Sequence, residues 1–367
     1  MSLTPRRRFL DYVRRVPGTR PVISPFLPKP QVVEATLQYL GLTVGDDPVQ
    51  NEVRLARALD YEPMFMTDLP GILFPWREDE ARSDEEWVIS VIPTSKGEWV
   101  RRARREWNAW GGDDSGFPVQ TEEDHEMLVT VCQEIADRET EIRAYYRAWR
   151  ERVGEEGVIV IGHPHVTWLA YQIGQETSLY HYQDYPDTYR RSEEAICRAA
   201  LYVFGIAMEE GIDFMSESSA GLEFTSPALF DTQDLPYLRA LARWTHEHGG
   251  LFWYHNCGFT RELILSGRFN RFEADVIETL SPPPEGDNED LAESRRHLDE
   301  SICSKGNLSL ILLRDGTVEE VVEATRQMMR DVRGYAHIYS TADAVLEGTP
   351  PENLAAFVRA IRQAKEK

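Results

Sequence analysis

A histidine and a cysteine two positions apart, His255 and Cys257, are the residues of this chain best suited to metal chemistry. They follow the apolar run 251–254, which is typical of a buried strand. Alternate side chains of a strand lie on one face, so the imidazole and the thiol are expected side by side where the strand ends at Gly258. Such a pair favours a soft divalent metal, zinc first. The competing interpretation is a buried core pair, because free cysteine is among the most buried residue types.

Other polar side chains stand where further apolar runs end. His163 and His165 follow the run 157–162, Glu217 ends the run 212–217, and Asp343 follows the run 335–341. We predict Asp343 as a third metal ligand, with a helix cap or a loop acid as its alternative. A carboxyl at a strand end is partly desolvated, which raises its pKa, so Glu217 is predicted as a general acid or a ligand. Its alternative role is a hydrogen bond to a loop.

The two histidines His163 and His165 lie two positions apart and are predicted to bind a substrate carboxylate or to carry protons. Half-exposed loop histidines are the alternative. Glu278, in the run 275–280, is expected to brace the interior of the fold.

The elements that must position these residues alternate between strands and helices. Eight predicted strands, each followed by a helix, begin at residues 21, 63, 158, 212, 250, 275, 302 and 335. Such alternation predicts a parallel sheet, and eight units close a (β/α)₈ TIM barrel. An open doubly wound sheet is the alternative, although no glycine-rich dinucleotide loop follows the first strand. In a barrel, the C-terminal strand ends form the active site, and the candidate side chains stand at those ends.

One segment interrupts the alternation. The runs 87–93 and 98–102 flank the polar turn 94–97, which contains a glycine and predicts a β-hairpin. We therefore predict a single barrel domain over residues 1–367, with residues 72–119 as an insertion.

The charge of the chain limits its partners. It carries 62 acidic against 40 basic residues, a net charge of −22, which repels nucleic acid and anionic membrane surfaces. No apolar run is long enough to span a bilayer. The four cysteines are scattered rather than arranged as a disulfide framework, so we expect a cytoplasmic protein.

Three motifs carry a family resemblance: GIDFMSESSAG from residue 211, HNCG from residue 255 and GTPPENLAAFVRAI from residue 348. In this order they resemble the uroporphyrinogen decarboxylase superfamily, and more narrowly its branch of cobalamin-dependent methyltransferases. The resemblance implies a (β/α)₈ barrel, commonly a homodimer. It further implies a zinc, held by the H-x-C pair and a later cysteine, that activates a thiol to accept a methyl group from a corrinoid. His255 and Cys257 match the pair, whereas Asp343 stands where the later cysteine is expected.

On this basis we expect a zinc-dependent methyltransferase that moves a methyl group between a small molecule and a corrinoid (cobalamin) carried on a partner protein. One alternative is a decarboxylase-like lyase without a metal. The decarboxylase, however, has an arginine-rich motif after its first strand, and residues 24–29 contain no arginine. A second alternative is a non-catalytic barrel that docks a corrinoid protein.

Overall fold

The computed structural model describes residues 3–107, 113–163, 169–219, 221–223 and 225–364. Its contacts divide the chain into two compact units. The first comprises Met1–Thr67, Ala148–Ile161 and Gly211–Lys367, and the second comprises Asp68–Arg147 and Gly162–Glu210. Two of the four boundaries between them fall within helix α6 (Glu139–Val153) and strand β5 (Val158–His163).

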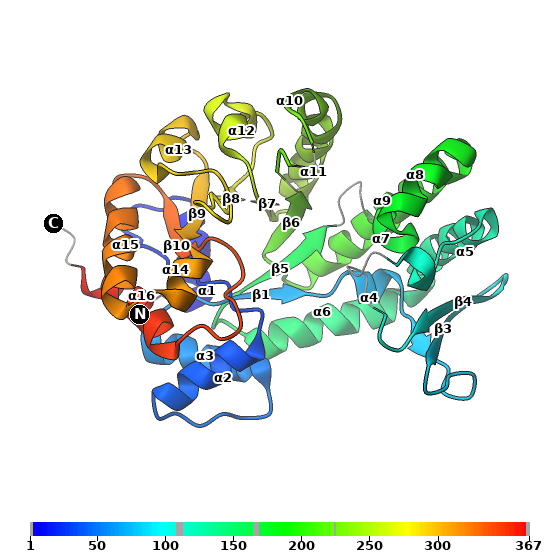
Figure 1. Cartoon of the computed structure of the whole chain (residues 1–367), viewed down its shortest axis with the longest axis horizontal. Coiled ribbons are helices and arrows are strands. Elements are labelled where there is room, and N and C mark those ends of the chain that lie inside the picture. The colour runs from blue at the N-terminus through cyan, green and yellow to red at the C-terminus, as the bar shows by residue number, and fades with distance from the viewer. Residues whose placement is uncertain (1–2, 108–112, 164–168, 220, 224, 365–367) are drawn as a thin grey trace. The chain divides into compact units, whose positions relative to one another are not determined.

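The first unit is built on a parallel sheet whose strands succeed one another in chain order (Figure 1). The order is β1 (Met64–Thr67), β5, β6 (Phe214–Ser219), β7 (Leu251–Asn256), β8 (Val276–Glu278), β9 (Cys303–Leu308) and β10 (His337–Thr341). This sheet confirms the TIM-barrel-like fold, with seven regular strands rather than eight.

The strand predicted at residue 21 is reduced to a short segment at the seam between β10 and β1. Ile23 forms an isolated parallel bridge with Tyr339, and the Ser24 amide donates to the Tyr339 carbonyl at 2.9 Å. On the other side, the Glu62 amide donates to the Ile23 carbonyl at 2.8 Å. Prolines at positions 21 and 25 lack the N–H that a longer ladder needs, so the segment stays short.

Helices cover the strands of this unit, and α11 and α15 pack on β7 and β9. Several begin at clear capping signals: Thr317 starts α15 with a capping box, and the Asp47 carboxylate accepts from two amides at the start of α3. The helices are α1 (Pro5–Val13), α2 (Pro30–Tyr39), α3 (Pro48–Leu59), α10 (Pro227–Leu229), α11 (Leu235–Glu247), α12 (Arg261–Leu265), α13 (Leu291–His297), α14 (Leu310–Asp315), α15 (Val318–Asp331) and α16 (Pro351–Gln363).

The barrel interior is apolar at the N-terminal ends of the strands. One or two residues of each strand, on the inward face, contribute to one core cluster, which includes Val276, Cys303 and Ile338. Helix α1 closes this end, because the Phe9 ring lies 5.8 Å from the Phe214 ring and 6.3 Å from the Trp253 ring. We call the opposite, C-terminal ends of the strands the mouth.

The second unit contains the predicted hairpin. Strands β3 (Trp87–Thr94) and β4 (Gly97–Arg104) pair antiparallel, and β2 (Arg77–Glu78) adds to β3. The unit also holds α4 (Pro70–Leu73), α5 (Glu122–Gln133), α7 (Ala170–Ile173), α8 (Gln175–Asp184) and α9 (Pro186–Glu209), so it extends well beyond residues 72–119. Whether the chain behaves as one domain with an insertion stays a prediction.

No helix in the described part of the chain combines the length and the apolar character that crossing a membrane requires.

Candidate metal centre

Three potential metal donors meet at the mouth. His255 lies near the end of β7, Cys257 follows that strand, and Asp343 lies two residues after β10. The His255 Nε2 atom is 2.8 Å from the Cys257 Sγ atom, and the Asp343 Oδ2 atom lies 3.6 Å from that sulfur and 3.8 Å from that nitrogen. The ligand atoms of all three residues lie within 4.8 Å of one another. His255 and Cys257 are thus close in the sequence, whereas Asp343 comes near them only through the barrel fold.

The backbone holds these donors in place. The Cys257 amide donates to the Ser219 carbonyl on β6 at 3.2 Å, which extends the strand pairing to the cysteine. The Ala342 amide donates to the Leu308 carbonyl at 2.8 Å, which fixes the residue before Asp343. The Ala344 amide donates to the Oδ1 atom of Asp343 at 2.6 Å, leaving Oδ2 toward the cysteine.

A buried ion pair lies behind the histidine. The register of β7 and β8 sets His255 opposite Glu278, and the His255 Nδ1 atom lies 2.8 Å from the Glu278 Oε1 atom. The other carboxylate oxygen of Glu278 accepts from the ammonium of Lys305, which is buried in β9. That ammonium lies 5.3 Å from the centre of the Trp253 ring. Proton donation from Nδ1 to Glu278 leaves Nε2 free to bind a metal, as carboxylate partners of ligating histidines do.

The electrostatics of the cluster are strongly coupled. Burial raises the pKa of Glu278, but the nearby charges of Lys305 and His255 outweigh it and lower that pKa to about 2. Burial acts to lower the pKa of His255, yet its hydrogen bonds with Cys257 and Glu278 raise it well above its ordinary value. The imidazole of His255 thus lies between the sulfur of Cys257 and the carboxylate of Glu278.

The donor set fits a divalent cation. A nitrogen, a sulfur and a carboxylate oxygen from three protein residues resemble a catalytic zinc site, which keeps one position open. Binding requires His255 and Cys257 to lose their protons. The cluster then holds three anionic side chains, those of Cys257, Asp343 and Glu278, and one cation, Lys305. Its net charge of about −2 complements a divalent cation.

Glu217 does not join these donors. Its strand neighbour Met215 accepts a hydrogen bond from Thr245 on the covering helix α11, so this face of β6 points away from the barrel interior. Glu217 lies opposite Tyr254 in the sheet, on the reverse face from His255. Burial, and to a lesser extent Asp234, raise the pKa of Glu217 well above its ordinary value. The direction of this pKa shift agrees with the expectation, but Glu217 lies on the helix-facing side of β6 rather than at the mouth.

The two remaining candidates are not brought to the cluster by any described contact. His163 is the last residue of β5, where the backbone alone is described, and His165 lies outside the described residues. Sequence reasoning also missed Lys305. Its signal was a lysine in the middle of a predicted strand, because a charge buried in a strand persists only with a partner.

A parallel (β/α) barrel with a candidate metal-ligand set at its mouth defines a broad class of enzyme-like barrels. Within that class, the family model for uroporphyrinogen decarboxylase (URO-D) matches residues 117–364, and the chain belongs to this family.

Two solved structures are similar to this chain to different degrees. A methyltransferase from Methanosarcina mazei matches with a TM-score of 0.63 and 13% sequence identity, over 99% of each chain. A B12-independent methionine synthase from Shewanella sp. W3-18-1 matches with a TM-score of 0.44 and 10% identity, over 88% of this chain and 90% of that one. At such identities, the first likeness shows the fold alone. No curated protein matches the chain.

Proposed function

We propose that this chain is a metal-dependent methyltransferase that binds zinc at His255, Cys257 and Asp343. It moves a methyl group between a small molecule and a corrinoid carried on a separate protein. The observation that carries the metal part is the convergence of three donor atoms within 4.8 Å at the mouth. The same cluster includes a carboxylate on the far nitrogen of the histidine, which a packed core histidine does not need.

Each residue of the cluster has its own task in this proposal. Glu278 fixes the tautomer of His255 by accepting the Nδ1 proton, and Lys305 keeps Glu278 ionised inside the barrel. Cys257 contributes a thiolate, and Asp343, whose side chain is 34% exposed, contributes an oxygen on the solvent side of the site. A bound zinc supplies Lewis acidity toward an oxygen or sulfur of the substrate.

The methyl-transfer part of the proposal has separate support. The motifs around His255 resemble cobalamin-dependent methyltransferases, and the similar structure with a TM-score of 0.63 is described as a methyltransferase. The proposed partner is a corrinoid protein, and a cytoplasmic homodimer remains part of the proposal.

Metal analysis of the purified protein tests the site. We expect about one zinc per chain in the wild type and a large loss in His255→Ala and in Cys257→Ser. His297→Ala and Cys197→Ser remove the same side chains elsewhere and serve as matched controls. Equal metal content in all five proteins would refute the site.

Methyl transfer is tested separately. Methylcobalamin and a panel of small thiols are incubated with this chain as the sole added catalyst, and loss of the methyl–cobalt absorbance is followed. We expect the reaction to stop in Cys257→Ser and after chelation. Metal binding without methyl transfer to or from any corrinoid would keep the site and reject the reaction.

A metal-independent lyase is the second candidate, and the match to the decarboxylase family model favours it. It predicts release of CO₂ from a porphyrinogen that continues after chelation. Among residues 24–29 no arginine is present to bind the carboxylates of such a substrate, which is why we place this function second. A non-catalytic docking barrel would show neither activity.

A further inference from the structure

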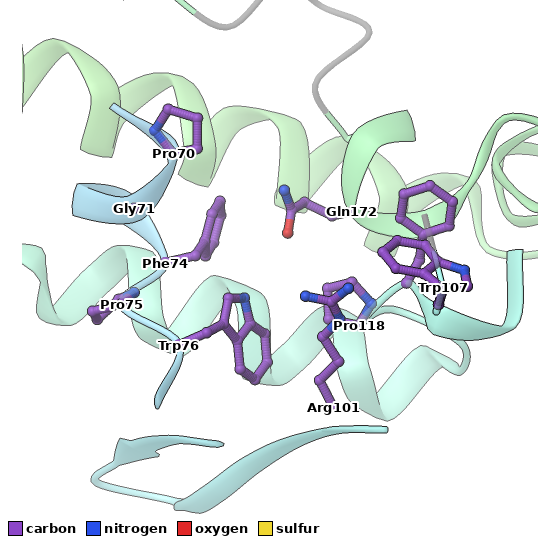
Figure 2. A pocket seen from close by; sticks show the side chains of 10 residues that line it. Pro70, Gly71, Phe74, Pro75, Trp76, Arg101, Trp107, Pro118 and Gln172 are labelled. Carbon is purple, nitrogen blue, oxygen red and sulfur yellow. The ribbon is translucent and has the colours of Figure 1, made fainter. Parts of the chain in front are cut away.

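A cavity in the second unit has the character of a ligand site. Its volume is about 410 Å³, within the range of small-molecule pockets. Aromatic rings, prolines and two polar side chains line it, and Figure 2 shows Arg101, Trp76 and Gln172 directed into the same space. The lining residues all belong to the second unit: Pro70, Gly71, Phe74, Pro75, Trp76, Arg101, Trp107, Phe117, Pro118 and Gln172.

The aromatic walls are held by their own contacts. The Trp76 ring packs at 4.7 Å from the buried Trp99 ring. The Trp107 ring lies edge-on to Phe117 at 5.0 Å, and its Nε1 atom donates to the Asp113 carbonyl at 2.7 Å. Gly116 is needed for this packing, because an added Cβ atom would lie 2.4 Å from the Trp107 ring. These walls are therefore preformed rather than loosely placed.

The charged group in the cavity, Arg101, has no carboxylate partner among the described residues. Arg101 is half-buried, its Nε atom donates to the Gly116 carbonyl at 2.7 Å, and its guanidinium lies 4.7 Å from the Trp107 ring centre. Burial lowers the pKa of Arg101 below its ordinary value. Arg104, whose side chain lies on the opposite face of β4, differs from Arg101 because it pairs with Glu86.

From these observations we propose that the cavity binds a small planar apolar molecule carrying one carboxylate. The terminal nitrogens of Arg101 can donate two parallel hydrogen bonds to one carboxylate. The aromatic side chains of the cavity wall suit a flat ring. The Gln172 amide offers a further polar contact. This site is independent of the metal centre and of the methyl-transfer proposal.

Calorimetric titration with 2-naphthoate and with its neutral analogue 2-naphthalenemethanol tests the assignment on the wild-type protein. We expect naphthoate to bind at least about tenfold more tightly than the alcohol, because only the acid pairs with Arg101. Equal binding of both compounds, or no binding of naphthoate at millimolar concentration, would overturn the proposal. This comparison needs no variant and stands whether or not the variants fold.

Variants then locate the site. Arg101→Gln keeps a donor for the Gly116 carbonyl but removes the charge, and we expect it to weaken naphthoate binding at least about tenfold. Arg104→Gln makes the same charge change on the other face of the strand and should bind like the wild type. If the two variants bind naphthoate alike, the carboxylate does not lie against Arg101 and the assignment is wrong.

Discussion

Asp343 gives the proposed metal centre its distinctive donor set. A carboxylate is a harder donor than a thiolate and transfers less charge to zinc. Replacing Asp343 by cysteine should therefore tighten zinc binding. We predict that Asp343→Cys keeps one metal per chain and raises the affinity by about tenfold or more. Competition with a chromophoric chelator under reducing conditions measures the change.

The matched variant Asp343→Ala removes the donor altogether and should bind zinc more weakly than the wild type. An alanine variant with unchanged affinity would mean that only His255 and Cys257 hold the metal.

Lys305 is predicted to matter for stability as well as for the site. Its ammonium is buried against Glu278, and Lys305→Met leaves that buried carboxylate without its ammonium partner. Breaking one partner of a buried pair costs about 3–5 kcal/mol of the free energy of unfolding. Urea unfolding measures this cost, and Lys96→Met, in the exposed hairpin turn, is the control that should change little.

The double variant Glu278→Gln/Lys305→Met shows whether the two side chains act as a pair. Because both charges are removed together, its loss of stability should be smaller than the sum of the two single losses. Additive losses would mean that the pair is not coupled.

At the scale of elements, the sequence predicts strands better than the faces they present. The rhythm of apolar runs located every strand of the sheet, and strand ends led to His255, Cys257 and Asp343. The alternation along one strand separates its two faces, but it does not say which face points into the barrel. The register sets Glu217 opposite Tyr254, and the contact of Met215 with helix α11 shows that this face of β6 meets a helix. Lys305 was missed because its partner, Glu278, lies on the neighbouring strand β8, which the sequence alone does not place beside it.

Helices α5, α8 and α9 share a buried histidine pair that makes stability depend on pH. The His125 Nδ1 atom lies 2.9 Å from the Ser192 hydroxyl oxygen, and its Nε2 atom lies 3.1 Å from the His181 Nδ1 atom. Burial, and then repulsion from His181, lower the pKa of His125 to about 4. The unfolded chain thus takes up a proton near pH 6.5, before the folded chain does, and folded-state stability falls as the pH drops from about 6.5 to 4.

We therefore predict that His125→Gln destabilises the protein most at pH 8 and progressively less toward pH 4. Thermal unfolding across this range measures the difference from the wild type. His246 provides a control of opposite sign, because its hydrogen bond to Asp275 raises its pKa. The loss caused by His246→Gln should be largest at low pH and shrink as the pH rises. A pH-independent difference for His125→Gln would contradict the assignment.

At the scale of the whole molecule, the barrel depends on joining distant parts of the chain. The seam between β10 and β1 is filled by the short segment at Ile23, whose amide donates to the Glu62 carboxylate at 3.0 Å. The same fully buried carboxylate accepts from Arg8 at 2.5 Å and from Arg362 of the last helix at 2.7 Å. One side chain therefore ties α1, the seam and α16 together.

Removing this carboxylate should loosen the seam and both ends of the chain at once. We predict that Glu62→Ala lowers the free energy of unfolding by about 3–5 kcal/mol, because it leaves partly buried guanidinium groups and the buried Ile23 amide without their acceptor. Asp60 is the matched control: it binds Arg20 and Arg362 too, but its side chain is 54% exposed. Asp60→Asn should cost less than about 1 kcal/mol. Urea unfolding and limited proteolysis of the terminal helices would expose a difference, and similar losses in both variants would show that burial at the seam adds nothing.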